Sequence, residues 1–448
     1  MIYLAIAVID QMALKKILII TYYWPPSGGG GVQRWLKFAK YLPEFGWEPI
    51  VFTPENPEFD LKDDSLTKEV SPELEVIRFP IWEPFGFYKK IFKKGGKLKQ
   101  GIVIEKTKMS LIDRLSVWIR ANLFIPDPRR FWVKPSVEFL VPFIHQHNID
   151  VVVTTGPPHS MHLIGKSLKK KCQVKWVADF RDPWSDWDIL EKLGVKGIAL
   201  SIHRKLERNV LGVSDLVLVA SKGIRRSLIA KYDKTEVRVV TNGYDTDDLK
   251  GIYADTKEKK FRITHMGLLN ELRNPETLWD CLEEICDERP DFQSDLELVL
   301  AGMVSSSILD RIQSSQQLSH TLNHLDYISH QEVLEYYLNS SVLLLLLNQT
   351  DTAQLIIPGK LFEYLMVNKP VLAIGKRESE VQEILSETEA GEVFNGDDRD
   401  QIKQMILIAY DRFRNGDISR SSGNAEKYLR KNLTHELVSI LDQLSLSK

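Results

Sequence analysis

The chain has 448 residues and a mass of 51.6 kDa, more than a single hydrophobic core usually supports, so we expect two domains. With 59 Lys and Arg against 61 Asp and Glu, the formal net charge is −2, and the overall basic character typical of nucleic-acid-binding proteins is absent. The three cysteines form no C-x-x-C pair, which argues against a zinc site or a disulfide framework and indicates a reducing compartment.

No apolar run approaches the roughly 18 residues of a membrane-spanning helix, so we expect a cytoplasmic protein. Residues Met1–Gln11 lack a basic stretch and a cleavage site, and we interpret them as an extension upstream of the first strand. The segment Phe87–Gly101 carries six lysines among aromatic and aliphatic side chains. This pattern indicates peripheral contact with the inner face of an anionic membrane or with a lipid-diphosphate acceptor, and the alternative is a solvated loop.

Short apolar runs alternate with helical periodicity along nearly the whole chain, as in parallel sheets covered by helices. The first half has seven expected strands: Lys16–Thr21, Pro49–Thr53, Leu74–Phe79, Asp150–Thr154, Lys175–Phe180, Leu216–Ala220 and Arg238–Thr241. The second half has six: Phe261–His265, Leu296–Ala301, His324–Ile328, Val342–Leu347, Val371–Ile374 and Gly391–Phe394. This predicts an α/β protein of two Rossmann-like domains, each a doubly wound parallel sheet, facing a cleft.

The expected organisation is a first domain over 12–244, a linker over 245–260, a second domain over 261–424 and a final helical segment over 425–448. In open α/β sheets, ligands bind outside the carboxyl ends of the strands. We therefore expect the functional residues in the loops that follow the strands.

Three loops of the first domain carry candidate residues. Tyr22–Gly31 ends in four glycines and leads to Arg34, which lets backbone amides and a cation approach a phosphate or sugar; the alternative is a flexible connector. His159 follows two prolines near a helix start, where the dipole favours a neutral imidazole that can bond a substrate hydroxyl; a surface histidine gives the same pattern. Asp179–Trp184 places three charges at a strand exit, either as an internal ion pair or with a carboxylate facing the cleft.

Two loops of the second domain carry the strongest signals. In Gly267–Pro275, Asn274 is expected to cap a helix, which would set Arg273 beside a helix N-terminus suited to a diphosphate, unless that arginine is simply solvated. Lys360 and Glu363 share one face of a helix's first turn. Lys360 can neutralise a phosphate while Glu363 accepts ribose hydroxyls; the alternative is an exposed lysine and a glutamate that complements the helix dipole.

The order of these loops resembles the retaining glycosyltransferases of the GT-B fold, in the large family of bacterial polysaccharide and lipid-glycan transferases (family 4-like, group 1). The matching residues are the glycine-rich first loop, Ser221 after the sixth strand, Thr241–Asp245 at the domain junction and Gly359–Tyr364. The resemblance extends from about Leu14 to the C-terminus.

The resemblance implies an acceptor-binding first domain, a donor-binding second domain and a final helix crossing back to the first. The implied activity moves a sugar from a nucleoside diphosphate sugar to a hydroxyl of a glycan or lipid-linked acceptor with retention, in cell-surface polysaccharide or lipid-linked glycan synthesis. The expected catalytic residues are Arg273, Lys360, His159 and Asp182, and the expected acceptor contacts are Arg34 and Arg181. The expected donor contacts are Gly29, Gly30, Gly267, Asn274, Ile328, Gly359, Leu361 and Glu363. No cofactor or metal is expected.

Two positions depart from the family pattern. The first glutamate of E-x7-E would stand eight positions before Glu363, where this chain has Leu355, so Gln354 or a backbone amide is expected to replace its contact with the donor sugar. Arg181 stands where the family often has a histidine.

Three other functions share parts of this pattern. An NAD-dependent oxidoreductase requires a G-x-G-x-x-G fingerprint that the first loop lacks. A sugar-nucleotide epimerase would use the same fold and donor pocket. A non-catalytic partner subunit that binds a nucleotide sugar is favoured by Leu355, because that residue removes a usual donor contact.

Overall fold

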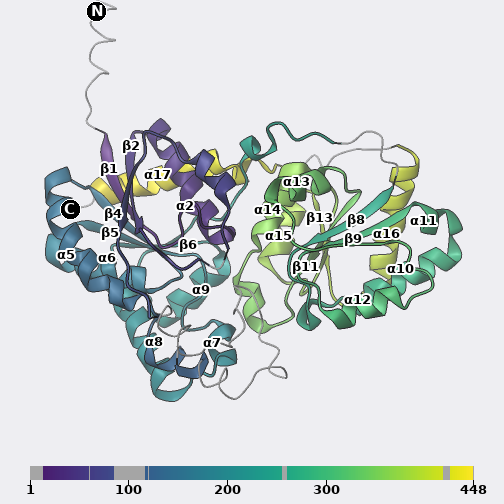
Figure 1. Ribbon diagram of the computed structural model, residues 1–448, viewed down its shortest axis with the longest axis horizontal. Helices are drawn as coiled ribbons and strands as arrows, with labels where there is room; N and C mark the ends of the chain where they lie inside the picture. Colours follow the sequence, from purple (N-terminus) through teal and green to yellow (C-terminus); the bar gives the residue numbers. More distant parts are fainter. Residues whose placement is uncertain are drawn as a thin grey trace, which may run out of the picture. The chain divides into compact units, whose positions relative to one another are not determined.

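The computed structural model describes residues 14–59, 61–84, 117–119, 121–254, 260–416 and 424–446 (Figure 1). The chain divides into two compact units, Met1–Thr241 with Arg430–Lys448, and Asn242–Leu429. The boundary thus falls after Thr241, three residues before the expected one at 244. The expected extension Met1–Gln11, the first-domain start at 12 and the segment Phe87–Gly101 lie outside the described residues, as does part of the expected linker.

The first unit is built on a seven-stranded parallel sheet in the order β3-β2-β1-β4-β5-β6-β7. Its strands are β1 (Lys15–Ile20), β2 (Trp47–Pro54), β3 (Glu75–Phe79), β4 (Val151–Gly156), β5 (Lys175–Phe180), β6 (Leu216–Val219) and β7 (Val237–Val239). Its helices are α2 (Gly30–Tyr41), α5 (Arg130–His147), α6 (Ser160–Cys172), α7 (Asp188–Lys192), α8 (Gly197–Leu211), α9 (Lys222–Lys231) and α17 (Arg430–Leu446), with short 3-10 helices at Leu42–Phe45 and Asp64–Glu69.

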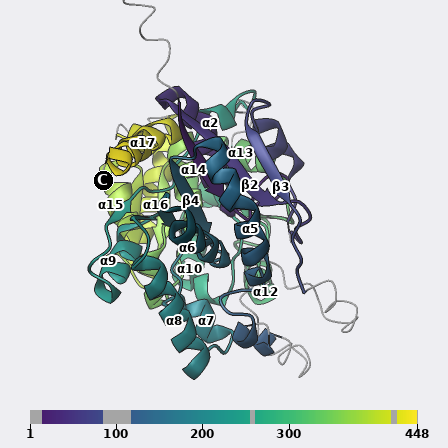
Figure 2. The ribbon, with the colours of Figure 1, turned by 90° about the vertical axis from the view of Figure 1, so that its left-hand side faces the viewer.

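Helices α2 and α17 lie together against one face of this sheet, as Figures 1 and 2 show. Trp35 and Phe38 of α2 and Leu437 and Leu441 of α17 are buried with Ile19 of β1 in one apolar cluster. Their spacing of three and four residues puts the apolar side chains of each helix on a single stripe. The last helix of the chain therefore completes the core of the first unit.

The second unit is built on a six-stranded parallel sheet in the order β10-β9-β8-β11-β12-β13. Its strands are β8 (Phe261–Met266), β9 (Leu296–Ala301), β10 (Leu322–Leu325), β11 (Val342–Leu346), β12 (Val371–Ile374) and β13 (Gly391–Phe394). Its helices are α10 (Glu276–Glu288), α11 (Pro290–Asp295), α12 (Ser306–Gln313), α13 (His330–Leu338), α14 (Gly359–Val367), α15 (Glu380–Glu387) and α16 (Arg399–Arg414), with 3-10 helices at Thr246–Leu249, Glu271–Arg273, Asp351–Leu355 and Glu426–Tyr428.

Two apolar cores cover the two faces of this second sheet. Side chains of α10, α12 and α16 form one cluster with the sheet, and side chains of α13, α14 and α15 form the other. The predicted fold class, two doubly wound parallel sheets, is therefore confirmed. Strand β10 lies earlier than the expected His324–Ile328: it ends at Leu325, so Ile328 lies in the following loop, ahead of the capping box that Ser329 and Glu332 form.

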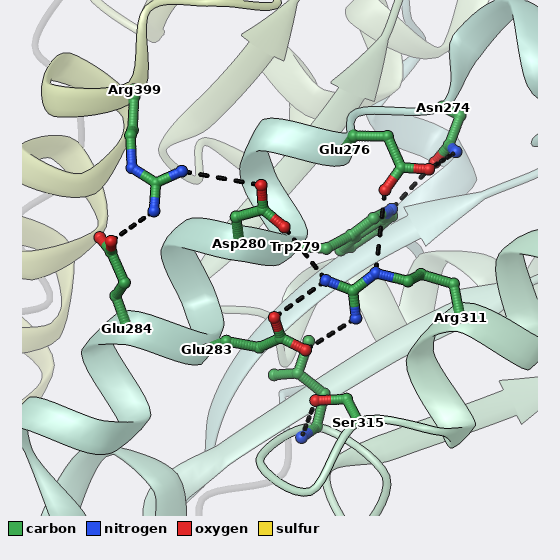
Figure 3. A network of polar contacts seen from close by, with 10 residues as sticks. Asn274, Glu276, Trp279, Asp280, Glu283, Glu284, Arg311, Ser315 and Arg399 are labelled. Atoms are coloured by element: carbon green, nitrogen blue, oxygen red, sulfur yellow. Dashed lines mark hydrogen bonds and ion pairs between the residues drawn. The ribbon is translucent and has the colours of Figure 1, made fainter.

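A network of ion pairs holds α10 between α12 and α16 (Figure 3). Arg311 of α12 makes a bidentate contact with Glu283, at 2.7 and 2.9 Å, and also reaches Asp280 at 3.1 Å. Arg399 of α16 pairs with Glu284 and with the second oxygen of Asp280. Because α10 follows the Arg273 loop, this network also fixes where that loop ends.

Arg311→Met is expected to lower the free energy of unfolding by about 1 kcal/mol, because one guanidinium joins several carboxylates of α10. The loss should shrink as salt screens the network. Chemical denaturation at low and high salt measures it, with Lys250→Met, which breaks an exposed pair with Asp247, as the control. Equal effects of the two changes would contradict the network's role.

Candidate functional site

In the second sheet, the order in which the chain adds strands reverses between β8 and β11, the two central strands. The chain runs outward from β8 through β9 to β10, then returns to β11 and continues outward to β13 on the other side. The loops that follow β8 and β11 therefore flank the point where a doubly wound sheet binds its ligand. The two loops span residues 267–275 and 347–358.

Arg273 joins these two loops. Its Nε donates to Oδ1 of Asn348 at 2.6 Å, and its guanidinium also donates to the carbonyl of Leu268 at 3.2 Å. Asn270 caps the short 3-10 helix that carries Arg273, by accepting from the amide of Leu272. Burial lowers the pKa of Arg273, which remains charged at neutral pH.

The predicted start of α10 is wrong by one residue. The helix begins at Glu276 with Pro275 in the capping position, and Asn274 makes no capping bond to its backbone. Oδ1 of Asn274 instead accepts from the indole of Trp279 at 2.9 Å, and its Nδ2 donates to Glu276 at 2.6 Å. Asn274 thus fixes the first turn of α10 through side chains.

Lys360 lies over Gly267, the first residue after β8. Gly267 has φ +112°, a conformation that favours glycine, and a Cβ built there would collide with Nζ of Lys360. The lysine is the second residue of α14, so its side chain stands beside the N-terminal amides of that helix. Burial, and then the charge of Arg273, lower its pKa to about 8, while Glu363 acts in the opposite direction.

Glu363 lies one turn further along α14 and is half-buried. Burial raises the pKa of its carboxyl group, and the charges of His330 and Lys360 partly oppose this. Leu361, between them, is 0% exposed in the apolar core, so only its backbone can face a ligand. The structure therefore brings Gly267, Lys360 and Glu363 together with Arg273, whereas the side chain of Leu361 points elsewhere.

Gly359 is the exposed first residue of α14 and directly precedes Lys360, so it lies at the same helix N-terminus as that lysine. Ile328 packs its side chain against the core of α13 and α14, which leaves its backbone as the group able to meet a ligand. Asn348 was not singled out from the sequence, although it is the first polar residue after the apolar run of β11. The position of that residue at a strand exit is the signal that could have found it.

Nucleoside diphosphate binding is expected to weaken about tenfold as the pH rises from about 7 to about 9. In this window Lys360, with a pKa of about 8, loses the charge that attracts phosphate. Lys360→Arg keeps the charge throughout and should flatten the dependence. Calorimetric titration with UDP, GDP and ADP across this range measures it, and an identical slope in both proteins would contradict the assignment.

In the first unit, Arg34 and Asp179 form a buried ion pair. Arg34 is 1% exposed and Asp179 0%, and their nearest atoms lie 2.9 Å apart. Asp179 also accepts from the indole of Trp35 at 2.7 Å and from the hydroxyl of Thr155 at 2.8 Å, and Arg34 donates to the carbonyl of Thr241. The enclosed guanidinium argues against the expected acceptor contact of Arg34. Asp179 therefore pairs with Arg34 of α2, and this differs from the pair with Arg181 inside the loop that the sequence offered as an alternative.

Arg181 instead spans the exits of the neighbouring strands. Its two terminal nitrogens donate to the carbonyls of Gly31 and Pro157, and its guanidinium lies over the ring of Tyr23. It is 8% exposed. Arg181 therefore fixes the glycine-rich loop to the loop after β4. Asp182 beside it is half-buried, and burial raises the pKa of its carboxyl group against the opposing charge of Arg181.

His159 directly precedes α6 and is 7% exposed. Its ring stacks on Trp184, with the centroids 4.5 Å apart and the planes within 2°. Neither ring nitrogen has a hydrogen-bond partner among the described residues. Burial, and then the neighbouring His162, lower its pKa well below the usual range, so the imidazole is neutral. Trp184 thus holds a neutral imidazole whose two nitrogens are buried and have no hydrogen-bond partner among the described residues.

The glycine-rich loop ends at the start of α2. Gly29 precedes the helix with φ 86°, which favours glycine, and Gly30 is the first helical residue. Among the described residues, no side chain caps this helix, and the amide of Val32 donates to the carbonyl of Gly29. Amides at such a helix start can bind an oxyanion.

Asp179→Asn is expected to lower the free energy of unfolding by about 3–5 kcal/mol, because it leaves the guanidinium of Arg34 buried without its counter-charge. Burial raises the pKa of Asp179, but Arg34 and the donors around it lower it more, so the net pKa is below the usual value. The stability it contributes is therefore present near neutral pH and lost as the pH falls through that lowered pKa.

Denaturation of both proteins as a function of pH tests this. Asp215→Asn, at a partly exposed pair with Lys169, is the control and should cost about 1 kcal/mol. Equal losses in the two variants would contradict a special role for the buried pair.

Comparisons with known proteins bear on the family and the fold of the chain. A family model described as "Glycosyl transferase 4-like domain" matches residues 29–243. The first unit carries a glycosyl transferase 4-like domain. No curated protein sequence matches the chain.

Solved structures resemble the whole chain. A glycosyltransferase from Rickettsia africae ESF-5 is 14% identical, with a TM-score of 0.60 over 97% of this chain and 99% of that one. An α,α-trehalose-phosphate synthase (UDP-forming) from Burkholderia xenovorans is 10% identical, with a TM-score of 0.59 over 96% and 100%. A candidate UDP-N-acetylglucosamine 2-epimerase from Listeria monocytogenes is 11% identical, with a TM-score of 0.54 over 97% of each chain. These similarities show the GT-B fold, with its two Rossmann-like domains.

Within the described residues, no helix is both long and apolar enough to cross a membrane. Groups of three or more His, Cys, Asp or Glu side chains that could hold a metal ion are likewise absent from that part of the chain.

Proposed function

We propose that the chain transfers a sugar from a nucleoside diphosphate sugar to an acceptor hydroxyl, with retention of anomeric configuration. The observation that carries this proposal is the pair of cations at the direction change of the second sheet, with Lys360 over Gly267 and Arg273 bonded across to Asn348. Both cations stand beside exits of central strands, where a diphosphate also meets the N-terminal amides of α14. The glycosyl transferase 4-like domain of the first unit supports the same class of reaction.

The proposed step breaks the bond between the anomeric carbon and the diphosphate and forms a bond from that carbon to the acceptor oxygen on the same face. The acceptor's proton passes to an oxygen of the departing phosphate, so no protein nucleophile is needed. Negative charge grows on the diphosphate as the bond breaks. Arg273 and Lys360 stabilise that charge, and fixed donors of this kind are typically worth about 3–4 kcal/mol each.

Glu363 is proposed to accept hydrogen bonds from the ribose hydroxyls, one turn along α14 from Lys360. Backbone groups of Gly267, Ile328, Gly359 and Leu361 are proposed as further donor contacts. In the first unit, the neutral imidazole of His159, together with Arg181 and Asp182, is proposed to bind and orient the acceptor hydroxyl. Amides of Gly29 and Gly30 are proposed to bind an oxyanion.

The proposed acceptor is a glycan or a lipid-linked glycan precursor in cell-surface polysaccharide synthesis, at the inner face of the membrane. No metal or cofactor takes part in the proposed step. Phe87–Gly101 is proposed as the membrane contact. Co-sedimentation with anionic vesicles tests it: binding that survives replacement of all six lysines of this segment by glutamine would rule the contact out.

A non-catalytic partner subunit is the second candidate, favoured by Leu355 in place of the family's first glutamate. Such a protein would bind a nucleotide sugar and show no turnover. A sugar-nucleotide epimerase is the third, favoured by the similarity to the Listeria protein. An epimerase would form product from the nucleotide sugar without any acceptor.

A thermal-shift panel with UDP, GDP and ADP and their sugar conjugates tests the proposal. One nucleoside diphosphate, at about 100 times its dissociation constant, should stabilise the protein by about 2.7 kcal/mol and raise its Tm by a few degrees. Absence of a shift with every compound would count against a nucleotide-sugar site.

Lys360→Met separates the function of this lysine from its effect on stability. Because burial holds the pKa of Lys360 near 8, its charge opposes folding at neutral pH, and that cost fades as the pH rises toward the ordinary value of 10.5. The variant should therefore gain about 1–3 kcal/mol without ligand, yet lose the nucleotide-dependent shift and about two orders of magnitude in turnover. Lys369→Met, just past the end of α14, is the control. An active Lys360→Met enzyme would remove this residue from the mechanism.

A further inference from the structure

Helix α13 packs against α14, the helix that carries Lys360 and Glu363 (Figure 1). Within α13, His330, Leu334 and Tyr337 follow one another at spacings of four and three residues, so they lie on one face of the helix. Leu334 and Tyr337 are buried in the apolar cluster that the two helices share. The face of α13 that meets α14 therefore carries a buried phenol.

The hydroxyl of Tyr337 donates a hydrogen bond to the carboxylate of Glu363. Burial raises the pKa of this carboxyl group, the charges of His330 and Lys360 lower it, and the charge of Asp248 raises it. The bond from Tyr337 also lowers this pKa, because it stabilises the charged form. The bond therefore favours the carboxylate, which accepts hydrogen bonds on both oxygens.

Tyr364 of α14 fixes the position of the Tyr337 ring. The two rings meet edge to face, with their centroids 4.9 Å apart and their planes at 85°. The hydroxyl of Tyr364 donates to the carbonyl of Leu344 at 3.2 Å, so its single hydrogen is already used and its oxygen can only accept. The hydrogen of Tyr337 then has two acceptors, Tyr364 and Glu363, and the charged carboxylate is the stronger one.

We propose that Tyr337 is a positioning residue for Glu363, which it holds in the orientation that accepts the ribose hydroxyls of the donor. The inference rests on the proposed function, in which Glu363 binds those hydroxyls. A hydrogen bond from the protein limits the rotation of the carboxylate, so its remaining lone pairs keep one direction. The packing of α13 on α14 needs only the ring of Tyr337, whereas this positioning needs its hydroxyl.

The test compares ribonucleotides with dideoxyribonucleotides, which lack the hydroxyl groups that Glu363 is proposed to bind. Calorimetry measures UDP, GDP and ADP and their 2′,3′-dideoxy counterparts with the wild-type protein and with Tyr337→Phe. The wild-type protein should bind its ribonucleotide about tenfold more tightly than the dideoxy form, and Tyr337→Phe should reduce this preference about fivefold at neutral pH. The dideoxy form should bind both proteins equally, within about twofold.

The pH dependence of this preference separates positioning from packing. The preference falls as Glu363 takes up a proton, and loss of the bond from Tyr337 raises the pKa of Glu363. The fall should therefore occur about one pH unit higher in Tyr337→Phe. Titration of Lys360 affects both nucleotide forms alike and cancels in their ratio. Carbon NMR of labelled glutamate carboxyl groups, assigned with Glu363→Gln, should show the same shift without any ligand.

Tyr336→Phe is the matched control, because it removes the hydroxyl of the neighbouring tyrosine of α13, whose ring lies under the guanidinium of Arg262. This variant should change neither the preference nor the titration. An unchanged preference, an unchanged titration of Glu363 or an equal loss of both nucleotide forms in Tyr337→Phe would overturn this proposal and leave the proposed function standing. Failure of UDP, GDP and ADP to bind the wild-type protein would overturn the proposed function, while the carboxyl titration would still decide whether Tyr337 acts on Glu363.

Discussion

The contact between Lys360 and Gly267 is the constraint on which the candidate site depends. An ammonium group can stand at the exit of β8 only because no side chain occupies the first position after that strand. The left-handed backbone of Gly267 and the second position of α14 meet there because β8 and β11 are neighbours in the sheet. Burial and the nearby charge of Arg273 disfavour the charged form of Lys360. A bound anion would supply the negative charge that stabilises it.

The same arrangement explains why residues outside the cation pair matter. Arg273 is held by an amide from the β11 loop, and the helix that follows Arg273 is held in turn by Arg311 and Arg399. In the first unit, Arg181 performs a comparable task by joining two loops, while Arg34 neutralises Asp179 beneath them. Each unit thus fixes its strand exits with arginines, whose planar forks bond several oxygens at once.

The sequence was sufficient for the fold because the strands are short apolar runs separated by clear helical stripes, and β5, β9, β12 and β13 fall at the expected residues. The pair Lys360 and Glu363 could be predicted from the sequence because it is local: a single helical turn places residues three apart on one face. The ion pair of Arg34 was not predicted, for the opposite reason. Its partner Asp179 lies 145 positions away, and such pairing depends on tertiary packing that local patterns do not contain. Asn348 was missed for the same reason, because its role comes from a residue 75 positions earlier.

The place of α17 in the first unit bears on how the chain is made. The helix packs on α2, yet its residues are translated after the entire second unit. During synthesis the part of α2 that α17 covers therefore stays exposed until residues 242–429 have been made. In topological terms the second unit is an insertion, connected at both ends to a first unit whose core closes last. A growing chain of this kind has a long interval in which α2 needs protection from other apolar surfaces.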